Sequence, residues 1–393
     1  MINKVINFGV YLIVFILPLY LIRFKIAWVP FNILEGLIII LFVLWLVTGR
    51  AYSSKYIFYP IFLIFLGVTI ATLFSEDISI SAGIFKSWFI SPLLFFIVLI
   101  NVVKNKKQIK NILLALFCSG LGVCLIALFY WLTNKLTYDG RLQAFYLSPN
   151  YLAMYLSPIL ILSLYLYFVF DKKIIKLLLF IAHCLLFIIL YLTFSYGAWL
   201  GVLAALIFIL FAFYKFKPVV LNKKIVIVFV LLILVGLISQ IPSQKFQGLL
   251  DLSYPSLESR LVIWQSAWEI TKDHSLIGIG PGMFQKYYLA YQVQLGPYLE
   301  WATPQPHSLF LAFWLQAGLL GLVGLIWLLI IFFKGLFYKK LDKEVLIINI
   351  FLGATMVYIL AHGLVDTTYW KNDLALIFWL IIALGYKGSR FSY

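Results

Sequence analysis

Two basic side chains of different chemistry stand in the last third of the chain, each beside an apolar stretch. His307 opens the segment "PHSLFLAFWLQAGLLGLVGL", where a polar loop gives way to hydrocarbon side chains. Arg260 stands in "SRLVIWQSAWEITKDH" and falls in the middle of the apolar face of a helix predicted over 260–272. A guanidinium is always charged and suits bidentate phosphate binding, whereas an imidazole takes up a proton near neutral pH. The pair could therefore bind an anionic group and accept a proton in a transfer reaction.

Each of the two residues also has a plainer interpretation. Arg260 could extend along apolar surface to reach lipid head groups, and His307 could be an ordinary polar residue at the end of a membrane span. If one continuous helix begins at His307, Gly318 and Gly321 lie within about 20° and 40° of the same face, at roughly 100° per residue. Small residues allow a second helix to approach closely. His307 is therefore predicted to face the bundle interior, where an ionisable group is a functional candidate.

Three further groups are candidates on the same side of the predicted bundle. Arg141, in "YDGRLQAFYLSPNYLAMYL", could contact a lipid head group or a substrate phosphate. Pro149 and Asn150 follow closely and are typical of a helix start. His362 and Asp366 are spaced one helical turn apart and form either a structural hydrogen-bonded pair or part of the site.

The composition requires a lipid environment for these residues. Hydrophobic residues make up 64% of the 393 and charged residues only 11%, against about a quarter in soluble domains. The net charge of +16 is explained by cytoplasmic loops facing anionic lipid, so no nucleic-acid partner is expected. Cys118, Cys124 and Cys184 fall within apolar runs, with no disulfide or metal spacing. The first apolar run lacks a small-residue cleavage site and is interpreted as an uncleaved span.

We predict an all-α integral membrane protein with about 12 transmembrane helices, each of about 20 mostly apolar residues. The predicted spans are 6–22, 31–49, 56–74, 84–103, 111–134, 149–170, 174–194, 196–214, 224–240, 306–333, 345–362 and 373–388. The chain is thus divided into spans 1–9 (residues 1–240), a large extracytoplasmic loop containing short helices (241–305) and spans 10–12 (306–393).

The charges of the loops predict the orientation. With both termini in the cytoplasm, about two thirds of the 30 lysines and arginines fall on the inner side. Most carboxylates fall on the outer side, and Glu35 is the only one in the interior of a predicted span. The large loop is therefore expected outside, with membrane lipid around the spans.

An ordered set of motifs resembles the O-antigen ligase and O-antigen polymerase superfamily of bacterial membranes. The resemblance covers residues 138–388 or so, and the first third matches only as generic membrane helices. Its most specific element is an order of features: Arg-x3-Trp, a glycine-rich turn, His-Ser at a helix start and a glycine near the eleventh position. The motifs are "GRLQAFYLSPNYLA", "TFSYGAWLGVLAALI", "SRLVIWQSAWEITKDHSLIGIGPGMF", "PHSLFLAFWLQAGLLGLVGL" and "YWKNDLALIFWLIIALG".

The resemblance implies a metal-independent glycosyltransferase of the bacterial cytoplasmic membrane, without a cofactor. Such enzymes move a glycan from an undecaprenyl-pyrophosphate carrier to a hydroxyl of a glycan, lipid A-core or other acceptor. Arg260 and His307 match the residues expected in catalysis, and the predicted substrate-binding residues are Arg141, Tyr196, His362 and Asp366. Relatives often carry arginine where this chain has Tyr196, which removes one candidate pyrophosphate ligand. Arg141, Arg23 or Lys286 could replace it.

A lipid-linked glycan transporter or flippase is the rival interpretation, because about 12 spans with both ends inside is a common transporter plan. Transporters often show repeated halves, whereas the one long loop here has no early counterpart. A flippase is also expected to carry several charges within its spans. Ligation, polymerisation and protein glycosylation differ only in the acceptor, which the sequence does not identify.

Overall fold

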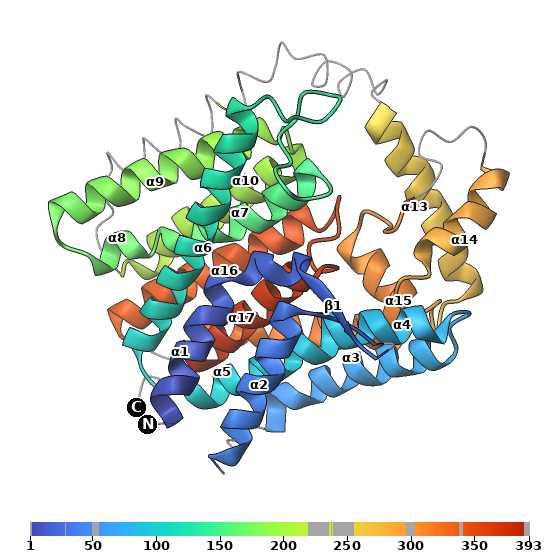
Figure 1. Ribbon diagram of the computed structural model, residues 1–393, viewed down its shortest axis with the longest axis horizontal. Helices are drawn as coiled ribbons and strands as arrows, with labels where there is room; N and C mark the ends of the chain where they lie inside the picture. The colour runs from blue at the N-terminus through green and yellow to red at the C-terminus, as the bar shows by residue number, and fades with distance from the viewer. Residues whose placement is uncertain are drawn as a thin grey trace.

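The computed structural model describes residues 2–27, 29–48, 55–218, 236, 238, 255–295, 303–337 and 341–388. Within these ranges the chain is helical apart from one small hairpin (Figure 1). The first half contains α1 (Ile2–Phe15), η1 (Leu17–Leu21), β1 (Arg23–Ile26), β2 (Val29–Asn32), α2 (Ile33–Val47), α3 (Lys55–Leu73), α4 (Ile78–Phe85), the π-helical turn η2 (Lys86–Ile90), α5 (Ser91–Val102), α6 (Lys106–Leu132), α7 (Pro149–Ser163), α8 (Leu166–Val169) and α9 (Lys173–Leu192). The second half contains α10 (Tyr196–Phe216), α13 (Pro255–Asp273), α14 (Phe284–Tyr291), η3 (Gln292–Gln294), α15 (Leu309–Leu336), α16 (Lys343–His362) and α17 (Asn372–Gly388).

The helices have the length and composition of a multi-pass membrane protein. Among the described residues, 8 helical segments are long and apolar enough to cross a membrane, and α1 and α2 are shorter apolar helices. The predicted ninth span, 224–240, lies outside the described residues except for positions 236 and 238. The count of about 12 spans and the large loop therefore remain predictions.

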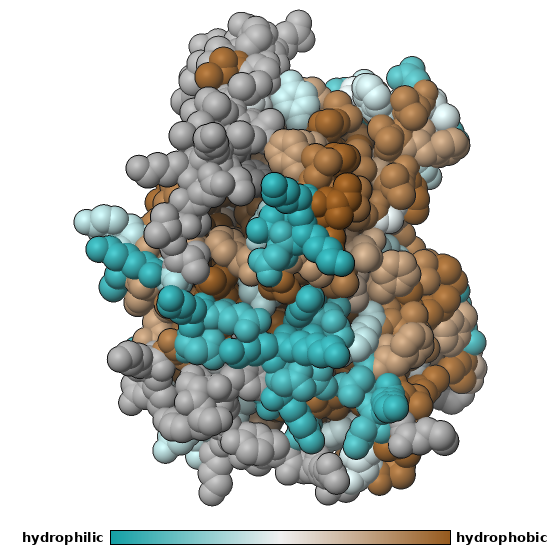
Figure 2. Space-filling view, turned by 90° about the vertical axis from the view of Figure 1, so that its left-hand side faces the viewer, coloured by the Kyte–Doolittle hydropathy of each residue, from teal (hydrophilic) through white to brown (hydrophobic). Residues whose placement is uncertain are grey.

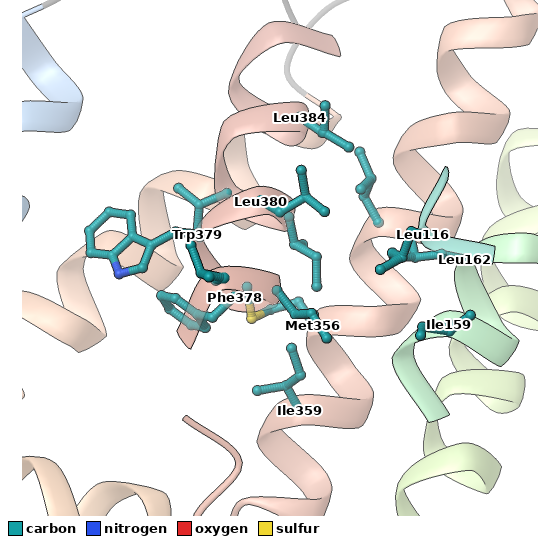
Figure 3. Packing of buried hydrophobic residues seen from close by; sticks show 14 of the residues in the cluster. Leu116, Ile159, Leu162, Met356, Ile359, Phe378, Trp379, Leu380 and Leu384 are labelled. Atoms are coloured by element: carbon teal, nitrogen blue, oxygen red, sulfur yellow. The ribbon is translucent and has the colours of Figure 1, made fainter. Parts of the chain in front are cut away.

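The centre of the bundle is formed by helices that are distant in sequence. The closest pairs are α3 with α15, α10 with α16 and α5 with α17. Figure 3 shows Met356 and Ile359 of α16 packed against Phe378 and Leu380 of α17. These side chains are buried within the protein, so both C-terminal helices are core elements that hold the segment between them in place.

The hairpin β1–β2 is the one departure from the predicted all-α fold. Its antiparallel register pairs Arg23 with Asn32 and Lys25 with Pro30. Pro30 disfavours helical backbone in the residue before it, and Ala27 has a positive φ of 53°. The first predicted span, 6–22, is divided between α1, which ends at Phe15, and η1, which contains Pro18 in its first turn. Ala27 and Pro30 then favour the hairpin that precedes α2.

A break in α15 corrects the predicted position of His307. Gly318 has φ 68° and ψ −177°, so α15 is two helical pieces rather than one. The freed backbone groups pair with the glycine-rich turn after α13, since the Ile279 amide donates to Leu315 O (2.6 Å) and the Leu319 amide donates to Leu276 O (3.0 Å). His307 itself precedes the helix and has φ 45°. The predicted face shared by His307 and Gly318 is therefore wrong, because neither residue has helical backbone.

One end of the bundle is basic and hydrophilic. Figure 2 shows a hydrophilic band on the face that contains the α8–α9 connection, with hydrophobic surface beside it. Salt bridges at this end join Lys106 to Asp342 (2.8 Å) and to Glu344 (3.4 Å). The hairpin, α13 and the segment 363–371 lie toward the other end (Figure 1). We call this other end the site end.

Helices α3 and α15 meet backbone to backbone through glycines. A Cβ on Gly67 would lie 2.6 Å from Gly321 N, and one on Gly324 would lie 2.8 Å from both Ile64 N and Pro60 O. The sequence prediction that Gly321 permits close helix approach is therefore confirmed, with α3 as the partner. Because backbone atoms cannot move aside cheaply, alanine at Gly324 must displace one helix.

We expect Gly324→Ala to lower the free energy of unfolding by about 1–3 kcal/mol, as overpacked cores do. Gly335→Ala is the matched control on the same helix, because nothing lies within 4 Å of the added Cβ. Thermal unfolding in detergent measures both. Equal melting temperatures for the two variants would contradict the proposed backbone contact.

Candidate active site around Asp366

A buried carboxylate lies at the centre of the polar groups at the site end. Asp366 is 2% exposed and belongs to the segment that connects α16 to α17. Its Oδ1 accepts hydrogen bonds from His307 Nδ1 (3.1 Å) and from the Thr367 amide (2.8 Å). Its Oδ2 accepts from Asn150 Nδ2 (3.0 Å) and lies 3.9 Å from Arg260 Nη2. One carboxylate thus connects α7 and α13 to the segment that precedes α15 and the segment that follows α16.

The orientation of His307 is fixed from two sides. Trp264 of α13 donates from Nε1 to the His307 carbonyl (3.1 Å), and Asp366 holds ring atom Nδ1. An ionised carboxylate only accepts hydrogen bonds, so Nδ1 carries the hydrogen. Nε2 has no hydrogen-bond partner among the described residues and is the basic nitrogen of the neutral ring. A carboxylate that sets the tautomer in this way prepares an imidazole to accept a proton.

Helix α13 explains the Arg-x3-Trp spacing. Arg260 and Trp264 are one turn apart, so the guanidinium approaches Asp366 from the same side as the indole approaches His307. Ile263, Ala267 and Ile270 of this helix are buried against the glycine-rich turn and α14. The predicted apolar face is thus confirmed at these three positions. Arg260 makes no hydrogen bond within the described part of the chain, and a quarter of its side chain is exposed.

A second cation is tied to the same carboxylate through Asn150. Arg141 donates from Nη2 to Asn150 Oδ1 (2.7 Å) and from Nε to Thr193 O (2.8 Å). Ser148 caps α7 by accepting from the Asn150 amide. The helix start predicted at Pro149 and Asn150 is therefore correct, but the Asn150 side chain also bridges Arg141 to Asp366, which the sequence analysis did not predict.

The turn between α9 and α10 carries Ser195, Tyr196 and Gly197, where the resemblance led us to expect an arginine in the middle position. Tyr196 is the first residue of α10 and is partly buried. Arg141 binds the Thr193 carbonyl of this same turn, so its guanidinium lies beside the turn. Lys286 instead pairs with Glu76 (2.5 Å), and Arg23 lies on the hairpin. Of the three candidate replacements, the geometry favours Arg141.

The side chains of His362 and Asp366 do not form a hydrogen-bonded pair, although the Asp366 amide donates to the His362 carbonyl (3.0 Å). Nδ1 of His362 is bonded to Tyr358 OH (2.8 Å), while its Nε2 is buried without a hydrogen-bond partner among the described residues. Gly197 packs against the His362 ring, where a Cβ would lie 2.7 Å from Cδ2. The predicted structural pair is therefore wrong, because Asp366 turns toward His307 and Asn150. His362 instead lies beneath the α9–α10 turn.

The charge of Asp366 is maintained by its neighbours. Burial by itself raises the pKa of this carboxyl, but the charge and hydrogen bond of His307 and the charge of Arg260 outweigh burial. The pKa of Asp366 is consequently held below its usual range, and the carboxylate is ionised at neutral pH. A buried anion of this kind positions cations and donors around it.

The glycine-rich turn is occupied by protein contacts rather than open to a phosphate. The amides of Gly278, Ile279 and Gly282 donate to His274 O, Leu315 O and Gln316 Oε1, respectively. The three glycines of this turn have positive φ. Its role is to pair the broken backbone of α15 and to fix the angle of α13.

Lys371 is a buried cation that the sequence analysis missed. Its ammonium lies 3.8 Å from the ring centroid of Tyr151, 4.7 Å from that of Tyr146 and 5.6 Å from that of Tyr20. No hydrogen bond to its Nζ is made by the described residues. Burial lowers the pKa of Lys371 to about 8, although Asp373 opposes the effect of burial and Arg23 adds to it. Tyr151 neighbours Asn150 in sequence, so this cation lies behind the Asp366 network.

Within the described ranges, no group of three or more His, Cys, Asp or Glu residues is placed to hold a metal ion. The side chains gathered around Asp366 carry an imidazole and two guanidinium groups beside the carboxylate. These groups suit proton transfer combined with stabilisation of a negatively charged leaving group.

Taken with the apolar helices, these features define a multi-pass membrane protein with a polar site at one end of the bundle. Residues 181–326 match the family model described as O-antigen ligase. Over this part of the chain, the match supports the resemblance to the O-antigen ligase and polymerase superfamily that was inferred from the motifs. It includes Tyr196, Arg260 and His307, whereas Arg141 and Asp366 lie outside the matched range. A comparison with curated proteins found no match.

Replacement of Lys371 by methionine should change the pH dependence of stability. Between pH 8 and 10.5 the unfolded lysine binds a proton that the folded one does not, so wild-type stability rises with pH in this window. The effect is roughly 1.4 kcal/mol per unit of pKa difference. We expect Lys371→Met to be more stable at pH 7, with an advantage that shrinks as the pH approaches 10. Thermal unfolding in detergent at each pH measures the difference in stability between wild type and Lys371→Met. Lys272→Met, at an exposed position, is the control. Parallel pH profiles for wild type and Lys371→Met would contradict a depressed pKa.

Proposed function

We propose that the protein is a membrane glycosyltransferase that moves a glycan from an undecaprenyl-pyrophosphate carrier to an acceptor hydroxyl. The O-antigen ligase family supports a membrane glycan ligase or polymerase. The single observation that supports the site is the shared carboxylate, since Asp366 lies 3.1 Å from His307 Nδ1 and 3.9 Å from Arg260 Nη2. An orienting carboxylate, an imidazole and an available guanidinium are the groups that this reaction requires.

The reaction couples one bond formed to one bond broken. The acceptor oxygen attacks the anomeric carbon, and the bond from that carbon to the pyrophosphate oxygen breaks. His307 Nε2 takes the hydroxyl proton, while Asp366 stabilises the imidazolium that results. The electron pair leaves with the lipid pyrophosphate, whose growing negative charge is stabilised by Arg260 and, next to it in the network, Arg141. A direct displacement of this kind inverts the anomeric centre.

The surroundings of the site fit a substrate that has both a polyprenyl chain and a glycan. The apolar helices suit the polyprenyl chain, while the polar groups gather at the site end. We place the site end on the extracytoplasmic side of the bacterial cytoplasmic membrane, because the opposite end carries the lysines of the predicted inner loops. Tyr196, at the α9–α10 turn, then lies beside the pyrophosphate position, while the buried His362 supports this turn from beneath.

The test uses wild-type protein reconstituted in vesicles with a radiolabelled undecaprenyl-pyrophosphate glycan. We expect His307→Ala to lower the rate of carrier release by about 10²–10⁴-fold, the range for a lost general base. Arg260→Ala should cost about 10²–10³-fold, as for one lost charge-stabilising donor. His274→Ala, whose ring packs on Tyr287 in the same region, and Lys272→Ala, on the same helix as Arg260, are matched controls.

Normal transfer by both site variants would refute the assignment of His307 and Arg260. Movement of the labelled lipid across the vesicle membrane without release of the carrier would favour the transporter interpretation instead. The product distinguishes the acceptors: an elongated lipid-linked glycan indicates a polymerase, and a glycan on a second lipid indicates a ligase.

A further inference from the structure

We propose that a second pocket at the site end, between the hairpin and the π-helical turn, binds a saccharide and holds the acceptor for transfer. This inference rests on the proposed function for its role, but the binding itself is independent of it. The cavity encloses about 400 Å³, within the roughly 300–1,000 Å³ of small-molecule sites. We call it the hairpin cavity. The residues used below to argue for it are Arg23, Asn32, Glu35, Ser87, Trp88 and Asn372.

The wall of the hairpin cavity is built from three elements that are fixed to one another. Lys86, on the π-helical turn, donates to Glu35 Oε2 of α2 (2.7 Å) and to the Pro30 carbonyl of the hairpin. Its ammonium also lies 4.0 Å from the Phe31 ring centroid. The Asn32 side chain caps α2 by accepting from the Glu35 amide. The π-helical turn offsets the helix here, and such turns are frequent at functional sites.

A buried acceptor on this wall is left without a partner. Glu35 is 2% exposed, and its Oε1 accepts no hydrogen bond from the residues that the structure describes. An unsatisfied buried polar atom is costly, and a carboxylate oxygen accepts hydroxyl hydrogens readily. A ligand hydroxyl in the hairpin cavity would supply the missing donor. Oε2 of Glu35 thus accepts a hydrogen bond from Lys86, and Oε1 remains to accept one from a ligand.

Donors for ligand oxygens face the same space. Arg23 is exposed and forms no ion pair with any described residue. Asn372 accepts from Trp88 Nε1 through its Oδ1 (3.2 Å), so its amide hydrogens point away from that bond and are available. Ser87 adds a hydroxyl. A carboxylate, a guanidinium, an amide and a hydroxyl around one small space form the mixed donor and acceptor set that sugar hydroxyls require.

An aromatic surface completes the site. Trp88 is held in place by Asn372 and by edge contact with Trp370, at 5.9 Å between ring centroids. The apolar C–H face of a sugar ring packs well against an indole, while the hydroxyls at its edge reach polar side chains. A lipid head group would instead require a cluster of cations, whereas Lys86 is neutralised by Glu35 and Arg23 remains the one unpaired cation among the described residues of the wall.

The hairpin cavity and the Asp366 site share one segment of chain. Asp366 stands near its beginning and Asn372 at its end, at most about 20 Å apart for six residues. Tyr369, between them, donates from its hydroxyl to the Trp88 carbonyl (2.7 Å). The outer residues of a saccharide longer than the hairpin cavity would therefore extend along this segment toward the imidazole of His307. The cavity lies in the first third of the chain and in α17, outside the matched range 181–326.

Gly83 provides a direct test, because it lines the hairpin cavity and nothing lies within 4 Å of an added Cβ. Gly83→Phe places a large side chain in the cavity from a position where the added Cβ itself meets no protein atom. Gly335→Phe, which is equally open but on α15 and not in the cavity wall, is the matched control. The probe is the free oligosaccharide cut from the surface glycan of the cell that makes the protein. Its binding to the full-length protein in detergent is followed by saturation-transfer NMR.

We expect binding to wild type, to Gly335→Phe and to the transfer-deficient His307→Ala, and no saturation transfer with Gly83→Phe. Arg23→Ala should bind roughly tenfold more weakly, as for one lost hydrogen bond to a charged group. Binding that survives in Gly83→Phe would overturn the proposal, as would co-purification of a phospholipid with wild type that Gly83→Phe lacks. Because His307→Ala separates binding from transfer, saccharide binding without any transfer activity would reject the proposed function while leaving the hairpin cavity assignment intact.

Discussion

The ionised carboxylate of Asp366 is the constraint on which the site end depends. A buried anion must be compensated, and here the compensation comes from donors and cations on elements far apart in the sequence. The carboxylate therefore brings α7, α13 and the segment before α15 to one point. It also sets the His307 tautomer. The carboxylate that holds these elements together is therefore also the group that orients the imidazole we propose as the base.

The break in α15 allows this convergence within a bundle of apolar helices. Helical backbone that is interrupted at membrane depth needs substitute hydrogen bonds. The glycine-rich turn supplies them through Ile279 and Leu276, and this contact fixes the direction of α13. Trp264 can then reach the His307 carbonyl. Glycines at 278 and 318 are required because the two backbones approach too closely for a side chain.

Much of this arrangement could be predicted from the sequence, and the failures have physical causes. Hydropathy predicted spans that overlap each of the 8 described helical segments long enough to cross a membrane. Periodicity predicted the burial of Ile263, Ala267 and Ile270 in α13, whereas Leu261 and Trp268 of the same predicted face are exposed. His307 was singled out correctly as a residue of the polar network, but its helical placement was wrong, since a left-handed residue and a broken helix carry no periodic signal. His362 and Asp366 were paired by spacing, whereas their side chains take different tertiary partners, Tyr358 for His362 and His307 with Asn150 for Asp366. Asn150 and Lys371 act through partners distant in sequence, and no local pattern indicates such partners.

The central claim is that His307 and Asp366 act as one unit, and a double-mutant cycle tests it most directly. Carrier release from a radiolabelled undecaprenyl-pyrophosphate glycan would be compared for His307→Ala, Asp366→Asn and the double variant, after confirming that each remains folded. Residues that act as a unit are strongly non-additive. The account predicts a double variant within about threefold of the slower single variant. A double variant whose loss equals the product of the two single losses would contradict it.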